Sequence, residues 1–351
     1  MNLNRVASLA ACVAAWITLG GGAAHAAQAG LPKHQQAVVQ EGTGGPEVLK
    51  LESVPVPRPG SGQVLIRVYA AAINPADYGQ LGRPPPAGNR QVAGLDVSGV
   101  IAAVGPDVSG LKVRQAVFGI ADRTAGINGA YAHYSIASTS SIAPKPPRLS
   151  YEEAAGLGVV GVTALRAVDQ ANVQAGQHVL ITGVAGGVGS SAAQIAMADA
   201  ATVLGTASAR HQAFLLALGI GKIIDYTQGN VAGQAGAIDA VIDTVGGSEA
   251  LDAFHAIKPG GRFVSVVRAA DITPELCTSA QVQCFGSPGP ASRAPADVIL
   301  RVGQLATHGK LTAHVDRAFP LASAAEALQY LHEGHAEGKV ILAVTRESSR
   351  R

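Results

Sequence analysis

The pattern of hydrophobic and polar positions changes twice along the chain. From about Gln35, short apolar runs alternate with segments rich in proline and glycine. QAVVQ and GQVLIRVYAAAI are typical of strands, and SVPVPRPGSG between them is typical of a loop. Further short strands are predicted in VSGVIAAVG and AVFGI. This regular succession of strands and turns favours a compact domain that is mostly antiparallel or barrel-like.

A different rhythm follows the proline-rich segment PKPPRLS at 144–150. YEEAAGLGVVGVTALRAV is helical in pattern, HVLIT is a short buried strand, and SSAAQIAMADA places Ala192, Ile195, Ala196 and Ala200 on one helical face. Strands in ATVLGTA, KIIDYT, IDAVIDTVG and GRFVSVV then alternate with helices in HQAFLLALG and SEALDAFHAIKPG. Such alternation requires right-handed crossovers, which build a doubly wound parallel sheet. We therefore predict a Rossmann-type domain over residues 159–296.

The pattern changes again after residue 297. Helices are predicted in ADVILRVGQLATHGKL and ASAAEALQYLHEG, and strands in AHVDRAFPL and GKVILAVT. Because the doubly wound unit is already complete, these elements are expected to return to the first domain. That domain then comprises residues 33–158 and 297–346, and the predicted fold class is α/β.

Composition and charge narrow the class of protein. Of 351 residues, 48% are hydrophobic and only 14% are charged, which is typical of a well-buried α/β protein and not of a disordered or fibrous one. The formal net charge is +2. No basic stripe is therefore expected, and nucleic acid is not predicted as a partner.

The N-terminal segment has the three parts of a secretory signal peptide. Arg5 precedes the apolar run VASLAACVAAWITLGG, and the small residues Ala24 and Ala26 fit cleavage after Ala26. We predict a signal peptide over residues 1–26, a periplasmic or secreted protein, and no stable membrane span after cleavage. A wrongly assigned start codon or a buried helix is the alternative, and the protein would then be cytoplasmic.

Two cysteines, Cys277 and Cys284, remain after such cleavage. Export permits a disulfide between them, but a spacing of seven residues in a loop does not establish one. Small buried hydrophobic side chains are the commoner role of such cysteines.

The stretch ITGVAGGVG at 181–189 joins the first strand of the predicted parallel sheet to its first helix. Glycines leave room at the positive end of the helix dipole, where the pyrophosphate of a dinucleotide binds to backbone N–H groups. A strand before, a helix after and four further strands make a dinucleotide site the favoured interpretation. The residues predicted to bind the cofactor here are Gly183, Gly186, Gly187, Val188 and Gly189.

The second predicted strand bears on the choice of cofactor. An NAD site usually has Asp or Glu about twenty residues after the turn, to bind the ribose hydroxyls. This chain has GTASARH there, with Thr206, Ser208 and Arg210 and no acid. A hydroxyl and a guanidinium suit a 2′-phosphate, so NADP(H) is the predicted cofactor. In the alternative, Arg210 only begins a solvated helix.

The chain resembles the zinc-independent quinone oxidoreductase branch of the medium-chain dehydrogenase/reductase superfamily. The resemblance rests on eight segments in order: VPVPRPGSGQVLIRVYAAAINPADYGQLG, GLDVSGVIAAVG, GAYAHY, SYEEAAGLGVVGVTAL, VLITGVAGGVGSSAAQIA, IDAVIDTVGG, KPGGRFVSV and GHAEGKVILAV. It implies a Rossmann domain inserted into a β-rich, GroES-like catalytic domain built from both ends of the chain. Substrate and nicotinamide then meet between the two domains.

The resemblance also permits a judgement on zinc. Zinc-dependent relatives bind the metal through a Cys and through a His in a Gly-His-Glu element. The corresponding positions here are Asn74 and Leu95, and no cysteine lies between Cys12 and Cys277. A tetrahedral Cys/His site cannot be assembled from these residues, so no metal is predicted.

The same resemblance assigns roles to single residues. Asn74, Tyr78 and Tyr131 are the predicted catalytic residues, with Asn74 beside the nicotinamide and the substrate carbonyl. Asp77 is expected only to fix this loop. The remaining cofactor-binding predictions are Thr163, Tyr226, Val245 and Lys339. In the alternative, the two tyrosines are packing residues and Asn74 supports the turn before Pro75.

The predicted function is reduction of quinones or α,β-unsaturated carbonyls by hydride transfer from NADPH, without zinc. The substrate is a small molecule, and a homodimer is left open. One alternative is an enoyl-thioester reductase, although no basic cluster for a carrier phosphate is visible in the sequence. Another is a non-catalytic nucleotide-binding or scaffold protein, which export motivates because NADPH is not expected outside the cytoplasm.

Overall fold

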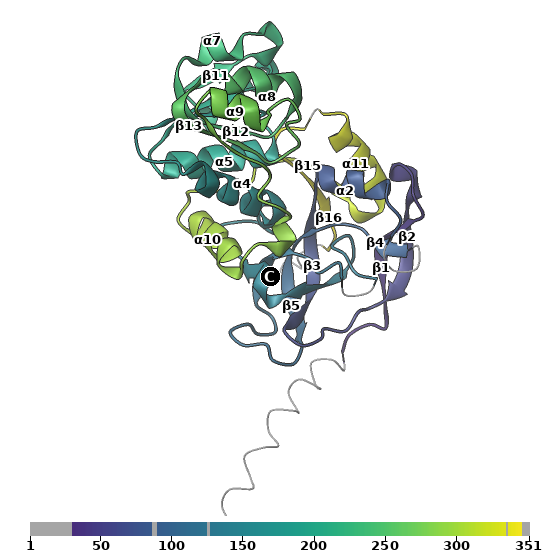
Figure 1. Cartoon of the computed structure of the whole chain (residues 1–351). Helices are drawn as coiled ribbons and strands as arrows, with labels where there is room; N and C mark the ends of the chain where they lie inside the picture. The colour runs from purple at the N-terminus through teal and green to yellow at the C-terminus, as the bar shows by residue number, and fades with distance from the viewer. Residues whose placement is uncertain (1–29, 86–89, 125–126, 335, 346–351) are drawn as a thin grey trace, which may run out of the picture.

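The computed structural model describes residues 30–85, 90–124, 127–334 and 336–345. Two large sheets organise it: a parallel sheet in the upper half of Figure 1 and a mostly antiparallel sheet in the lower half. The predicted signal peptide lies outside the described residues. Within the described ranges, no helix is long and apolar enough to cross a membrane.

The upper sheet has six strands in the order β11-β10-β9-β12-β13-β14, and every neighbouring pair is parallel. Its central strand buries Val179, Leu180 and Ile181 completely, as a strand covered by helices on both faces must. The predicted doubly wound parallel sheet is confirmed. Its strands are β9 (His178–Ile181), β10 (Thr202–Thr206), β11 (Lys222–Ile224), β12 (Ile238–Asp243), β13 (Ile257–Ser265) and β14 (Gln283–Phe285). The connecting helices are α5 (Gly187–Ala198), α6 (Gln212–Ala217), α7 (Val231–Ala235), α8 (Gly247–Phe254) and α9 (Pro274–Ser279).

Two details of this sheet differ from the sequence prediction. The helix predicted to run through KPG ends at Phe254, and these residues open β13 because Ile257 pairs with Ile238 of β12. Strand β14 was not predicted. It is only three residues long, and its pairing with β13 (Phe263 opposite Cys284) defines it, not any local pattern.

The lower sheet combines both ends of the chain. Strand β16 pairs antiparallel with β3, so the predicted return of the C-terminal segment is confirmed. The lower sheet comprises β3 (Gln63–Ile73), β5 (Asp96–Val104), β6 (Ala116–Ile120), β7 (Tyr134–Ser138), β8 (Ile142–Pro144), β15 (Val315–Pro320) and β16 (Lys339–Ala343). A separate small sheet holds β1 (His34–Glu41), β2 (Leu49–Pro55) and β4 (Arg90–Val92). The helices of this half are α2 (Pro75–Leu81), α10 (Ala296–Thr307) and α11 (Ala324–His332). The exact domain boundaries remain a prediction.

The passage between the two halves is made by α3 (Tyr151–Ala155) and α4 (Gly158–Ala171), which the sequence predicted as one helix. The break falls at Gly156, where a Cβ would come within 2.7 Å of the Cβ of Ala313. The start of α4 is then placed against β5, and the backbone N–H of Val159 donates to Asp96 Oδ1 over 2.6 Å. This contact fixes the parallel half against the antiparallel half.

Cys277 of α9 and Cys284 of β14 form a disulfide, with their Cα atoms 6.1 Å apart. Of the two alternatives that the sequence left open, the structure has the bridge and not two separate hydrophobic side chains. Helix α9 turns back against β14, and this brings the two sulfurs together.

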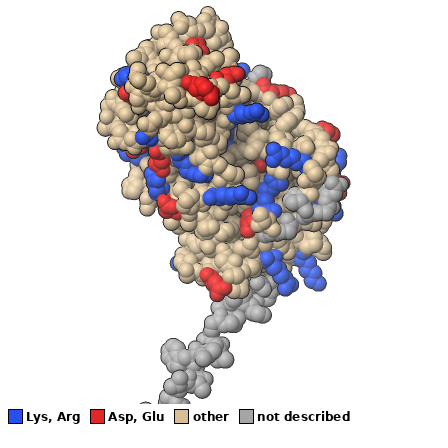
Figure 2. All heavy atoms as spheres, in the orientation of Figure 1, with Lys and Arg blue, Asp and Glu red and all other residues tan. Residues whose placement is uncertain are grey.

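Charged side chains show no continuous stripe on the face drawn in Figure 2. Lys and Arg lie mostly in the band between the upper and lower halves, with Asp and Glu among them.

Candidate active site

The glycine turn between β9 and α5 has the shape that a dinucleotide pyrophosphate requires. Gly183 has φ of +60°, which favours glycine. A Cβ on Gly189 would lie 2.4 Å from the carbonyl oxygen of Gly183, so glycine there lets the helix close onto the turn. A Cβ on Gly186 would meet only that same oxygen at 3.4 Å. The missing side chain of Gly186 therefore leaves an open cradle at the start of α5, and the residues present fit a dinucleotide.

Gly187 leaves room for the protein itself. A Cβ there would lie 2.8 Å from Cδ of Lys339 and 3.1 Å from Cγ1 of Val160. The N–H of Gly338 donates to the carbonyl oxygen of Ala185 over 2.8 Å. The beginning of β16 is therefore held directly against the glycine turn, and Lys339 enters the site from there.

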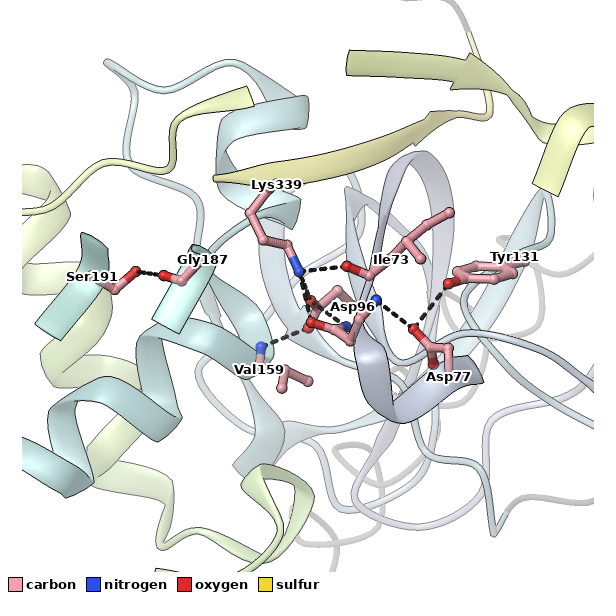
Figure 3. A network of polar contacts seen from close by, with 9 residues as sticks. Ile73, Asp77, Asp96, Tyr131, Val159, Gly187, Ser191 and Lys339 are labelled. Carbon is pink, nitrogen blue, oxygen red and sulfur yellow. Dashed lines mark hydrogen bonds and ion pairs between the residues drawn. The ribbon is translucent and has the colours of Figure 1, made fainter. Parts of the chain in front are cut away.

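Lys339 lies at the centre of a buried polar network (Figure 3). Its side chain is only 4% exposed. The Nζ donates to the carbonyl oxygen of Ile73 over 2.8 Å and to Oδ1 of Asn74 over 2.6 Å. It also lies 3.5 Å from Oδ2 of Asp96 in a buried ion pair. The predicted cofactor-binding lysine is thus also a partner of the predicted catalytic asparagine.

Asn74 is the N-cap residue of α2 and is 2% exposed. Its Nδ2 donates to Oδ2 of Asp96 over 3.0 Å, while its Oδ1 faces the ammonium of Lys339. An ammonium can only donate and a carboxylate only accepts, so these two partners fix which end of the amide is oxygen. The second N–H of Nδ2 has no acceptor within the part of the chain that the structure describes.

Burial shifts the pKa values of Asp96 and Lys339 toward their neutral forms, and the attraction between the two charges acts against this shift. Burial raises the pKa of Asp96 to about 6, although the Lys339 charge and the hydrogen bonds from Asn74 and Val159 lower it. Burial likewise lowers the pKa of Lys339, against the attraction of Asp96 and Asp77. The two groups depend on each other, because either charge alone would be strongly disfavoured at this depth.

Asp77 holds the backbone of the same loop, as the sequence predicted. Its Oδ2 accepts from the N–H of Asn74 over 2.9 Å and from the hydroxyl of Tyr131 over 2.9 Å. Tyr131 is fully buried, and burial raises the pKa of its hydroxyl well above the usual value. Its one hydroxyl proton is therefore directed at Asp77.

Tyr78, the third predicted catalytic residue, lies on α2 outside this network. Its ring stacks on His332 of α11, with centroids 3.8 Å apart and planes 8° apart. Its hydroxyl has no hydrogen-bond partner among the described residues. A catalytic role for Tyr78 and for Tyr131 remains a prediction.

The remaining predicted cofactor residues lie on or directly after elements of the parallel half and on α4, and their role in binding a cofactor stays a prediction. Val245 follows β12, is 49% exposed, and its Cγ2 would lie 2.6 Å from a Cβ on Gly183. Ser208 occupies the N-cap position of a short turn after β10 without a capping hydrogen bond from its side chain. Tyr226, which is 43% exposed, begins the turn after β11. Thr163 is half-buried on α4, one turn beyond the Val159 contact with Asp96.

Arg210 is engaged within the protein. Its Nε donates to Nε2 of His211 over 3.0 Å and its guanidinium donates to the carbonyl oxygen of Gly334 over 3.0 Å. His211 in turn contacts Glu337 at 2.9 Å. The side chain thus links the turn after β10 to the segment that follows α11.

Three buried or half-buried acids in the site were not singled out from the sequence: Asp96, Asp243 and Glu249. Asp243 ends β12, where its carboxylate accepts from Thr182, Ser265 and the N–H groups of Val245 and Gly246. It holds the carboxyl ends of neighbouring strands together. Asp96 is the first residue of β5 and Asp243 the last of β12, and an acid at the end of a buried, largely apolar strand is the signal that could have identified them.

No group of three or more His, Cys, Asp or Glu that could hold a metal ion occurs in the described ranges. Independence of zinc remains a prediction from the sequence.

Comparison with known proteins places the chain in a family. The model of the alcohol dehydrogenase GroES-like domain matches residues 60–147, and that of the zinc-binding dehydrogenase matches residues 218–342. The chain is 32% identical over 336 residues to the NADPH-dependent alkenal/one oxidoreductase of Arabidopsis thaliana, covering 90% of this chain and 81% of that protein. It is 32% identical over 321 residues to human quinone oxidoreductase, covering 85% and 94%. The solved structure of the quinone oxidoreductase from Coxiella burnetii is 34% identical with a TM-score of 0.80, covering 89% of this chain and all of that one.

The fold and these matches define an oxidoreductase of the medium-chain dehydrogenase/reductase superfamily. Within it, the chain belongs to the quinone oxidoreductase-like branch.

Proposed function

We propose that this protein reduces quinones or α,β-unsaturated carbonyls with a reduced nicotinamide dinucleotide, without zinc. The names of the relatives support the substrate class, since they include quinone oxidoreductases and an alkenal/one oxidoreductase. A bound reduced nicotinamide would supply the hydride. The glycine cradle at Gly183, Gly186 and Gly189 would hold the pyrophosphate.

The observation on which the proposal depends is the fixed amide of Asn74. Lys339 and Asp96 determine its orientation and leave one N–H for a substrate oxygen. A hydrogen-bond donor that is held in place before the reaction stabilises the negative charge that develops on a carbonyl or quinone oxygen. The positive charge of Lys339 directly behind the amide favours the same charge. Asp77 and Tyr131 position the backbone of this loop.

Different observations favour and oppose a preference for NADP(H). Ser208 and Arg210 favour NADP(H), and the plant relative is named as NADPH-dependent. The hydrogen bonds of Arg210 to His211 and Gly334 weigh against it, because a 2′-phosphate would have to compete for the same guanidinium.

A substrate panel tests the function. The protein is mixed with NADPH or NADH and with a quinone, a free enone or a crotonyl thioester, and nucleotide oxidation is followed. We expect turnover of the quinone and the enone. Asn74→Ala should reduce kcat by about a hundredfold with dinucleotide affinity unchanged, as loss of a transition-state donor does. Asn172→Gly is the matched control, because Asn172 lies at the end of α4 with φ of 50°, which glycine tolerates. Dinucleotide binding without turnover of any substrate would favour a scaffold.

We further propose that the protein is exported. The tripartite N-terminus supports this, and so does the Cys277–Cys284 disulfide, because disulfides persist mainly in oxidising compartments. Mass spectrometry of the protein from its native host tests it: a chain that begins at Ala27 is expected, and a chain that begins at Met1 in the cytoplasm would contradict it. A homodimer remains a prediction, which analytical ultracentrifugation would test.

A further inference from the structure

An acid lies at the end of the second strand of the parallel sheet, although the sequence of that strand has none. Thr206 is the last residue of β10, and its hydroxyl donates to Oε1 of Glu249. Glu249 belongs to the first turn of α8 and lies 43 positions further along the chain. Helix α8 begins directly after Val245 and Gly246, and this places its first turn beside the end of β10.

The same contacts connect Glu249 to the glycine turn. The N–H of Gly183 donates a hydrogen bond to the hydroxyl oxygen of Thr206 over 2.9 Å, and the hydroxyl in turn donates a hydrogen bond to Glu249. A hydroxyl has one proton, so Thr206 has none left to donate to a phosphate. The end of β10 therefore presents the carboxylate of Glu249 and not a free hydroxyl donor of Thr206.

The position and the negative charge of Glu249 together bear on which dinucleotide can bind. A carboxylate at the end of the second strand, beside the first glycine of the turn, accepts hydrogen bonds from the adenosine ribose hydroxyls and repels a 2′-phosphate. Glu249 is half-buried, and its repulsion is therefore less screened than that of a surface acid. Arg210, the group that would oppose it, already donates to His211 and Gly334.

We propose that Glu249 is the residue that sets cofactor choice in this protein, with its carboxylate favouring the unphosphorylated dinucleotide NAD(H) over NADP(H). The proposal rests on the dinucleotide-dependent function proposed above. In other dinucleotide sites, Asp or Glu at the end of the second strand accepts hydrogen bonds from the ribose hydroxyls. Glu249 would do the same here, but it reaches the ribose position from α8.

Calorimetric titration of the protein with NADH and NADPH at pH 8 tests the proposal without reference to turnover. In Glu249→Gln, the ratio of the NADPH affinity to the NADH affinity should rise about tenfold, the effect of removing one nearby like charge at moderate screening. Glu249→Ala should shift the ratio in the same direction, and this variant replaces Glu249→Gln in the test if the glutamine variant does not fold. Glu249→Asp keeps the charge and should shift it less.

Glu275→Gln is the matched control, because Glu275 is an exposed acid of the same half, in the first turn of α9. Its ratio should equal that of the unaltered protein. If both dinucleotides bind and the ratio in Glu249→Gln and Glu249→Ala stays within twofold of the unaltered protein, the role of Glu249 is wrong and the proposed function stands. If neither dinucleotide binds the folded protein, both proposals are wrong.

Discussion

Lys339 and Asn74 lie 265 positions apart in the chain, and the Nζ of one donates to the Oδ1 of the other over 2.6 Å. Lys339 opens β16, whose neighbour Gly338 is bonded to the glycine turn, and Asn74 caps α2 at the end of β3. One buried ammonium therefore connects the predicted cofactor turn to the predicted catalytic amide.

Two glycines of the turn should respond differently to the same substitution. Gly189→Ala places a Cβ against backbone that cannot move aside, so the melting temperature should fall. Gly186→Ala meets only ordinary contact, and Gly186 has φ of −76°, so the protein should keep its melting temperature. That same Cβ fills the cradle and should weaken dinucleotide binding about tenfold or more. Calorimetry of unfolding and of binding measures both. Unaltered dinucleotide affinity in Gly186→Ala would contradict the placement of the pyrophosphate.

The Lys339–Asp96 pair should behave as a unit in unfolding. Lys339→Met leaves the Asp96 carboxylate buried without its partner and should lower the free energy of unfolding by about 3 kcal/mol. The double variant with Asp96→Asn should lose less than the sum of the two single variants. Urea denaturation of the four proteins measures the coupling. Additive losses would mean that the two charges do not compensate each other.

Titration of Asp96 should make the free energy of unfolding depend on pH. Its pKa is about 6 in the folded protein and 3.8 as the ordinary value. The folded state therefore binds more protons than the unfolded state between these values, and the Asp96 contribution to the free energy of unfolding falls as pH rises from about 4 to about 6. Above pH 6 that contribution is constant. Denaturation at a series of pH values should show this fall in the unaltered protein and a smaller one in Asp96→Asn.

The same titration should appear in activity. Only ionised Asp96 accepts from both Asn74 and Lys339, so kcat for enone reduction should rise as pH passes through about 6. Loss of this limb in Asp96→Asn would support the assignment to Asp96. Persistence of the limb in that variant would assign it to another group.

Removal of the hydroxyl should affect the stability of the protein differently at Tyr131 and at Tyr78. Tyr131→Phe leaves the buried Asp77 with one donor fewer, and Oδ1 of Asp77 already has no partner in the described part of the chain. The free energy of unfolding should fall by about 2 kcal/mol. Tyr78→Phe keeps the stacking on His332 and should change stability by less than about 0.5 kcal/mol. A fall in kcat in Tyr78→Phe with stability unchanged would support a hydroxyl that touches the substrate.

The Cys277–Cys284 bridge should contribute to stability. Replacing both cysteines by alanine should lower the free energy of unfolding by about 2 kcal/mol, the size expected for a short closed loop. Thermal unfolding with and without a reducing agent provides the comparison: the reducing agent should lower the melting temperature of the unaltered protein and leave the double variant unchanged. An equal response of both proteins would show that the bridge is not formed in solution.

The sequence by itself determined the alternation of strands and helices, the parallel sheet, and the turn at 181–189. These depend on neighbouring residues: the period of the apolar positions selects strand or helix, and glycines mark where the backbone turns tightly. The sequence also indicated Asp77 as a structural acceptor that fixes the loop of Asn74, and the carboxylate accepts from the N–H of Asn74.

Only the tertiary structure decided which side chains meet. The absence of an acid near Arg210 favoured NADP(H), but Glu249 reaches the end of β10 from α8. The disulfide likewise required α9 to fold back on β14. The buried charge of Lys339 finds Asp96 and Asn74 only after both ends of the chain have joined one sheet. A hydrogen bond or an ion pair depends on distance in space, and no local pattern of residues encodes the distance between segments that lie far apart in sequence.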